Sequence, residues 1–162
     1  MLNAMDADKS LRRWVVWLLD GEGAHATFDQ AVHGFPAKLR GAKPDGLPHT
    51  GWQVLEHMRM AQWDILDFSV NPKYKAMAWP DDYWPKRDSP RAGEWEKSVR
   101  QFHADLAAMR KLIANPKTDL HAPIPWGDGQ TVLREAMLVA DHNSYHLGQL
   151  VLVRKALGAW KG

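Results

Sequence analysis

The chain has 162 residues, a formal net charge of +2 at pH 7 and no cysteine. The lack of cysteine excludes a disulfide scaffold, a thiolate zinc site and a cysteine nucleophile, and it is compatible with the reducing cytoplasm. The nearly balanced charge leaves no basic face for nucleic acid, and no segment approaches the ~20 apolar residues needed to span a bilayer. We therefore expect a cytoplasmic protein that binds neither nucleic acid nor a membrane.

A chain of this length can build its own hydrophobic core, so residues 1–162 are expected to form one domain, with residues 1–7 flexible. Residues 8–20 are apolar on nearly all sides, a Gly-Glu-Gly sequence interrupts them, and 24–33 continue with apolar residues at helical spacing. This pattern predicts a broken first helix. Residues 34–49 are rich in glycine, proline and lysine and predict a long connection, a kind of segment that often carries functional residues.

The second helix is marked at its start by Thr50, a candidate N-cap, and at its end by Asn71-Pro72. Between them apolar residues recur three and four apart, and His57 lies inside this apolar stripe. Its imidazole should therefore face the core, where it needs a polar partner, and a hydrogen-bonded core histidine is the alternative to a metal ligand. Four prolines and four aromatic residues then make 71–90 a stiff connection that either covers a site or only packs.

The third helix is expected to begin with Ser89 as its N-cap and Pro90 in its first helical position. Apolar residues then repeat four and three apart until Asn115, which is the clearest helical pattern in the chain. A second irregular connection follows at 116–130.

The last helix opens at Thr131 and should run for about 26 residues, roughly 39 Å, to a left-handed cap at Gly158. Its run 150–153 is apolar on every side. A helix segment of that kind indicates burial at a subunit contact as well as in the core, so we expect a homodimer.

Four helical segments without a hairpin signal predict an all-α four-helix bundle with a broken first helix and long irregular connections. If neighbouring helices run antiparallel, the second and fourth helices start at the same end, and His57 and His142 lie within ~6 Å of each other along the bundle axis. Connections 34–49 and 116–130 would then roof that end. The candidate residues for the mouth of a pocket there are His49, His121 and Trp126.

A pair of histidines, His142 and His146, lies one helical turn apart on the last helix, so both rings can reach one metal ion. With His57 they would supply three nitrogen ligands and leave at least one coordination position open, as catalytic sites do. Imidazole suits several late divalent ions, of which we favour zinc or nickel. The spacing rules out a His-Glu-x-x-His site and the paired Glu-x-x-His elements of a di-iron bundle.

Two carboxylates lie one heptad from these histidines on the same helical faces: Glu135 precedes His142, and Asp64 follows His57. Either carboxylate could orient a ligand ring or move a proton, with Glu135 as the candidate catalytic residue, and the alternative for both is an ordinary ion pair. Gln149 shares the face of the histidine pair and is a further candidate neighbour of the metal.

Three segments, 52–59, 133–136 and 141–150, resemble the DinB-like (DinB/YfiT) superfamily of metal-dependent four-helix bundles, and the resemblance covers nearly the whole chain. It implies that a divalent metal is held by one histidine of the second helix and by a His-x-x-x-His pair of the fourth. Here these positions are His57, His142 and His146. Characterised relatives include mycothiol-dependent isomerases and bacillithiol-type S-transferases, and many members are homodimers.

Three functions remain open from the sequence. The first is a metal-dependent transferase that activates a low-molecular-weight thiol co-substrate and attacks a small-molecule substrate. The second is a metal-assisted hydrolase in which Glu135 or His121 carries the proton. The third is a non-catalytic, dimeric bundle that only binds a metal or another ligand.

Overall fold

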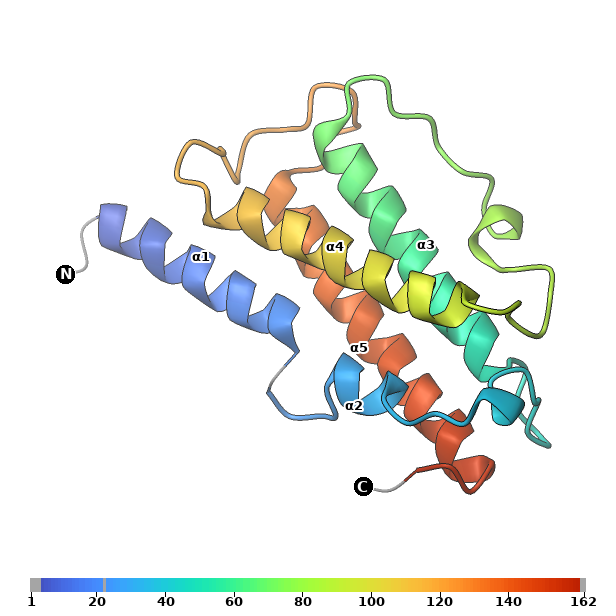
Figure 1. Ribbon diagram of the computed structural model, residues 1–162. Coiled ribbons are helices and arrows are strands. Elements are labelled where there is room, and N and C mark those ends of the chain that lie inside the picture. The colour runs from blue at the N-terminus through green and yellow to red at the C-terminus, as the bar shows by residue number, and fades with distance from the viewer. Residues whose placement is uncertain (1–3, 22, 161–162) are drawn as a thin grey trace.

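The computed structural model describes residues 4–21 and 23–160. Within them the chain is helical, with one isolated bridge between Pro123 and Thr131 and no strand, which confirms the predicted all-α class (Figure 1). No helix among these residues is both long and apolar enough to cross a membrane. The helices are α1 (Ala4–Asp20), α2 (Phe28–Val32), α3 (Gly51–Val70), α4 (Glu94–Ala114) and α5 (Val132–Ala156), with short 3-10 turns η1 (Ala37–Leu39) and η2 (Asp81–Tyr83).

The first helix is broken as predicted, since α1 ends at Asp20 and α2 starts at Phe28. However, α1 already begins at Ala4, so residues 4–7 are helical where a flexible segment was expected, and residues 1–3 lie outside the described part. A longer helix satisfies more of its own backbone hydrogen bonds, which favours extending it toward the chain end.

The cap at Thr50 is present as a capping box: its hydroxyl accepts from the Gln53 N–H, and the Gln53 side chain accepts from the Thr50 N–H. The predicted start of α4 at Ser89-Pro90 is wrong. Its N-cap is Gly93, whose φ of 77° is a left-handed conformation that glycine adopts without strain. Arg91 instead donates its backbone N–H to the Glu94 carboxylate, which holds this stretch in a turn before the helix.

The helix directions differ from those expected. The helices α3 and α4 run parallel, and α5 runs antiparallel to both (Figure 1). Accordingly, His57 near the start of α3 meets His146 in the second half of α5. The indole of Trp126, which precedes α5 in the chain, donates a hydrogen bond to the carbonyl oxygen of Phe68 near the end of α3. The second and fourth main helices therefore start at opposite ends of the bundle.

The physical reason lies in residues 71–93, which we call the α3–α4 connection. Helix α3 has 20 residues, so the chain must travel roughly 30 Å to return to its starting end. About ten extended residues cover that distance. The connection is longer than that, so α4 can start beside the start of α3 instead of beside its end.

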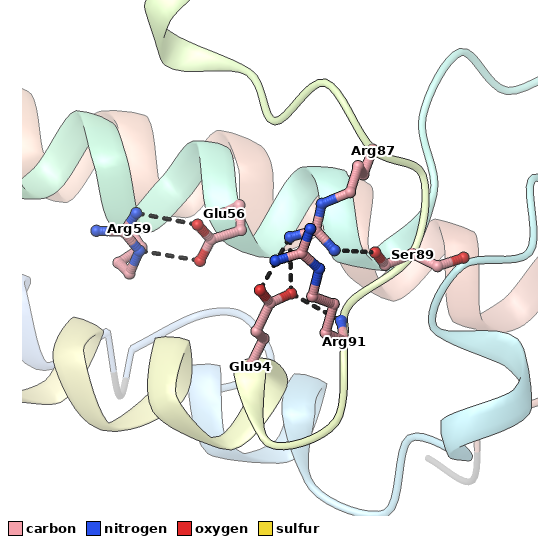
Figure 2. Close-up of polar contacts among 6 residues, drawn as sticks. All are labelled: Glu56, Arg59, Arg87, Ser89, Arg91 and Glu94. Carbon is pink, nitrogen blue, oxygen red and sulfur yellow. Dashed lines mark hydrogen bonds and ion pairs between the residues drawn. The ribbon is translucent and has the colours of Figure 1, made fainter.

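Polar contacts fasten the α3–α4 connection across the starts of α3 and α4 (Figure 2). Arg87 donates to both carboxylate oxygens of Glu94, at 2.9 and 2.8 Å. Thr50 and Gln53 donate from their side chains to the backbone carbonyl and the carboxylate of Asp88. The middle of the connection is thereby held over the side of α3.

Arg154 ties the broken first helix to the end of α5. It is only 4% exposed, and its guanidinium donates to the carbonyls of Gln30, Ala31, His33 and Ala159. Buried carbonyl groups that lose their donors are costly, because they cannot turn to water instead.

We expect Arg154→Met to lower the free energy of unfolding by about 3 kcal/mol, because it leaves these carbonyls without a donor. Urea unfolding monitored by circular dichroism measures the change. The matched control is Lys155→Met, next in sequence but exposed, which should leave stability nearly unchanged. Equal stability of the two variants would contradict this role of Arg154.

Candidate metal centre

Three histidines meet where α3 packs against α5. His57 lies in the second turn of α3, and His142 and His146 lie one turn apart on α5. The Nε2 atom of His57 is 3.0 Å from that of His146 and 3.1 Å from that of His142. The three candidate ligand atoms all lie within 4.8 Å of one another, so one metal ion could be held among them. The convergence predicted from the sequence is present.

The outer ring nitrogens of two of these histidines are fixed by hydrogen bonds. His57 donates from Nδ1 to the carbonyl oxygen of Tyr83 at 2.8 Å, and His146 donates from Nδ1 to Oε1 of Gln149 at 2.9 Å. A ring that carries its proton on Nδ1 presents a lone pair at Nε2. Both rings are therefore held with a metal-ligating nitrogen facing the centre, the arrangement that outer partners create in metal sites.

The electrostatics agree with neutral imidazoles. Burial lowers the pKa of His57 to about 4, with His146 adding to the effect, and burial together with the neighbouring His146 and His57 lowers the pKa of His142 to about 3. The pKa of His146 is lowered as well, chiefly by burial. Neutral imidazole is the form that binds metal ions.

The donor set fits a divalent cation. Lone pairs at Nε2 of His57 and His146 face each other at 3.0 Å with no proton between them when both Nδ1 atoms donate outward. Nitrogen ligands of one ion at about 2.1 Å lie roughly 3.0–3.4 Å apart. The Nδ1 atom of His142 is buried and has no hydrogen-bond partner among the described residues. Its Nε2 atom faces Nε2 of His57 at 3.1 Å, inside the cluster.

An aromatic side chain from the α3–α4 connection covers His57. The ring of Trp84 stacks on His57 at a centroid distance of 3.9 Å and an interplanar angle of 1°. It also stacks on His49 at 3.9 Å, so His49 lies near the centre. Its place at the mouth of the pocket stays a prediction, because His49 lines a separate, smaller cavity beside the end of α5. The aromatic connection therefore packs against the histidine cluster.

A cavity of about 410 Å³ adjoins the histidines between α3, α5 and the α3–α4 connection. His142 lies on its wall together with Asp64 and Glu135, which are 6% and 2% exposed. Asp64 accepts hydrogen bonds from the phenols of Tyr83 at 2.6 Å and Tyr74 at 3.0 Å. Burial and this hydrogen bond raise the pKa of Tyr74 to about 12, and burial also raises the pKa of Tyr83, so both phenols remain donors.

Sequence reasoning placed two residues incorrectly. It put His121 and Trp126 at the same end as His49, but the antiparallel course of α5 carries connection 116–130 to the other end of α3. His121 is exposed there, and neither residue lines the cavity. Conversely, Tyr83 and Trp84 were not predicted as site residues. Their position in a connection rich in proline and aromatic residues was the feature of the sequence that could have indicated them.

The family model of the DinB superfamily matches residues 20–150, and this chain belongs to that superfamily. The match extends from the end of α1 into the last third of α5 and includes His57, His142 and His146. Searches of curated proteins and of solved structures found no match.

Removing one ligand should abolish tight metal binding. We expect titration calorimetry of the metal-free protein with Zn²⁺ and Ni²⁺ to give one site per chain. His57→Ala should weaken it at least about 100-fold, because two imidazoles remain and the orienting contact of Tyr83 is lost. The control is His103→Ala, whose side chain is 46% exposed and contacts Asp29. Unchanged affinity in His57→Ala would exclude this centre.

The metal-free protein should lose stability in acid. Folding lowers the pKa of His57 from 6.5 to about 4 and that of His142 from 6.5 to about 3. Above pH 6.5 both imidazoles are neutral in the folded and unfolded states, so the free energy of unfolding is highest there. It should decrease as the pH falls below 6.5, because only the unfolded chain then takes up the protons. We expect a loss of roughly 1–2 kcal/mol per imidazole at pH 5. Urea unfolding at several pH values should show a smaller loss for His142→Gln than for the parent. Equal losses would contradict the burial of a neutral His142.

Proposed function

We propose that this DinB superfamily protein is a metal-dependent enzyme that transfers a low-molecular-weight thiol to a small electrophile at His57, His142 and His146. The supporting observation is that three inward-facing Nε2 atoms adjoin a cavity through His142. We propose zinc or nickel as the ion, since imidazole suits both. A bound divalent ion lowers the pKa of a coordinated thiol and keeps a position open for it.

The protein's own residues have three tasks in this reaction. Tyr83 and Gln149 hold two ligand rings in the correct tautomer. Glu135 is 2% exposed on the cavity wall and accepts the proton that leaves the thiol. The sulfur then forms a bond to the electrophilic carbon, and the leaving group departs with its electron pair and takes up the proton from Glu135.

The second candidate is a metal-assisted hydrolase, which is favoured by two buried carboxylates, Asp64 and Glu135, on the same cavity wall as His142. In this reaction Glu135 takes the proton of the attacking water and passes it to the leaving group. His121 is exposed and does not line this cavity, which supports Glu135 over His121 as the proton carrier. The two candidates differ in whether turnover requires an added thiol.

We also propose that the protein is a cytoplasmic homodimer. Leu152 is 50% exposed within the apolar run 150–153, which supports a subunit contact near the end of α5. A chain without cysteine suits a compartment that holds reduced thiols for it to use.

Metal-loaded protein should consume small electrophiles when cysteine or another small thiol is present, and a chelator should stop this. Glu135→Gln should lower kcat roughly 10²–10⁴-fold through loss of the proton carrier, while elemental analysis shows that it retains the metal. Chelator-sensitive turnover without thiol would replace the transferase by the hydrolase. No turnover under either condition, with metal bound, would leave a non-catalytic metal-binding bundle.

A further inference from the structure

A second cavity lies between α3, the start of α4 and the α3–α4 connection. Its volume is about 620 Å³, within the usual range of small-molecule sites, and it shares no lining residue with the cavity beside the histidines. It adjoins a different face of α3, on which Trp52, Glu56, Met60 and Trp63 recur four and three residues apart. His57, the residue after Glu56, points roughly 100° away around the helix.

Two buried hydrogen-bonding groups on the wall of this second cavity have no partner. Trp52 is 3% exposed, and its indole N–H makes no hydrogen bond with any described residue. Ser98 is 6% exposed, and its hydroxyl makes no hydrogen bond with the described part of the chain either. A buried donor without a partner costs free energy, so nearly all buried donors in proteins are paired. Both groups are therefore free to donate to a ligand.

The two donors are close in level along the bundle. Trp52 is the second residue of α3, and Ser98 is the fifth residue of α4. The two helices run parallel from the same end, so both residues lie within the first two turns (Figure 1). One small molecule in the cavity can accept from both.

The charges around the second cavity leave one cation without a counter-charge. Both oxygens of Glu56 accept from Arg59, and both oxygens of Glu94 accept from Arg87 (Figure 2). Lys97, the fifth charged residue of the lining, forms no ion pair with any other described residue. A cationic ligand would have to displace an arginine from one of these carboxylates, whereas an anion finds an ammonium group and two donors unengaged.

The other lining residues suit an aromatic ring. Met60 and Trp63 of α3 and Met77 of the α3–α4 connection contribute apolar surface to the same cavity. Trp63 is 42% exposed, so its indole is accessible from solvent. Thioether and indole groups both pack favourably against aromatic rings.

We propose that the second cavity binds a small aromatic carboxylate. Its oxygens accept from the Trp52 indole and the Ser98 hydroxyl, and Lys97 balances its charge. Hydrogen bonds to an ionised acceptor are stronger than those to a neutral one, so the charge raises the affinity. The inference is independent of the proposed function, because no residue of the histidine cluster takes part in it.

Three ligands of nearly equal shape test the charge preference: phenylacetate, phenylacetamide and phenethylamine. Titration calorimetry on the full chain is done with a chelator present, so that no metal at the histidines can bind the carboxylate. Phenylacetate should bind at least about tenfold more tightly than the amide, and the amine most weakly. An amide that binds as tightly as the carboxylate, an amine that binds best, or no binding by any of the three would overturn the proposal.

Substitutions locate the binding site. Ser98→Ala should weaken phenylacetate binding about tenfold, and Lys97→Gln about threefold, because water screens an exposed ammonium group. One matched control is Ser69→Ala: Ser69 is also buried, at 7% exposed, but its hydroxyl donates to the carbonyl oxygen of Ile65. The other is Lys111→Gln, an exposed lysine of α4 outside the cavity. Unchanged affinity in Ser98→Ala, or an equal loss in Ser69→Ala, would overturn the proposal.

The indole proton of Trp52 gives a direct reading of contact with the ligand. In proton–nitrogen correlation spectra, Trp52→Phe identifies the resonance of this N–H by its loss. In the parent protein the resonance should move when phenylacetate is added and stay in place with phenethylamine. A resonance that does not move as phenylacetate saturates the protein would overturn the proposal. Should Trp52→Phe not fold, the affinity of Ser98→Ala decides alone.

Discussion

The packing of α3 against α5 is the contact on which the other features depend. It buries polar side chains as well as apolar ones, and each buried polar group requires a partner from another element. His57 finds its partners on α5 and on the α3–α4 connection. One turn further along, Gln62, which is 1% exposed, donates to Phe102 O of α4 and accepts from Asn143 of α5. These contacts fix the register of three helices.

Tyr83 connects the histidine cluster with the buried carboxylate of Asp64. Its carbonyl oxygen accepts from His57, and its hydroxyl donates to Asp64, so one residue contacts both the histidine cluster and the acidic end of the cavity. The residue belongs to the α3–α4 connection, whose far end is clamped by the Arg87–Glu94 ion pair (Figure 2). A connection whose regular structure is limited to the short η2 turn is thereby ordered enough to hold the His57 ring and the Asp64 carboxylate in place.

The antiparallel packing of α3 and α5 also explains why two acidic side chains line the same cavity. With α3 and α5 parallel, Asp64 and Glu135 would lie on opposite sides of the histidines, because one follows His57 and the other precedes His142. In the antiparallel arrangement both lie on one side, where they share a cavity with His142. The structure thereby places two buried carboxylates on the wall of the cavity that the histidine cluster adjoins.

The sequence alone determined what depends on local spacing: the class of fold, the cap at Thr50, the one-turn spacing of His142 and His146, and the core-facing position of His57. Helical periodicity assigns a residue to a face, because each residue turns the helix by a fixed angle. It does not say in which direction the neighbouring helix runs, since helices pack side by side in either direction. The path of the α3–α4 connection decided that, and with it which residues surround the centre: Trp84 and Tyr83 enter it, and His121 and Trp126 lie at the other end.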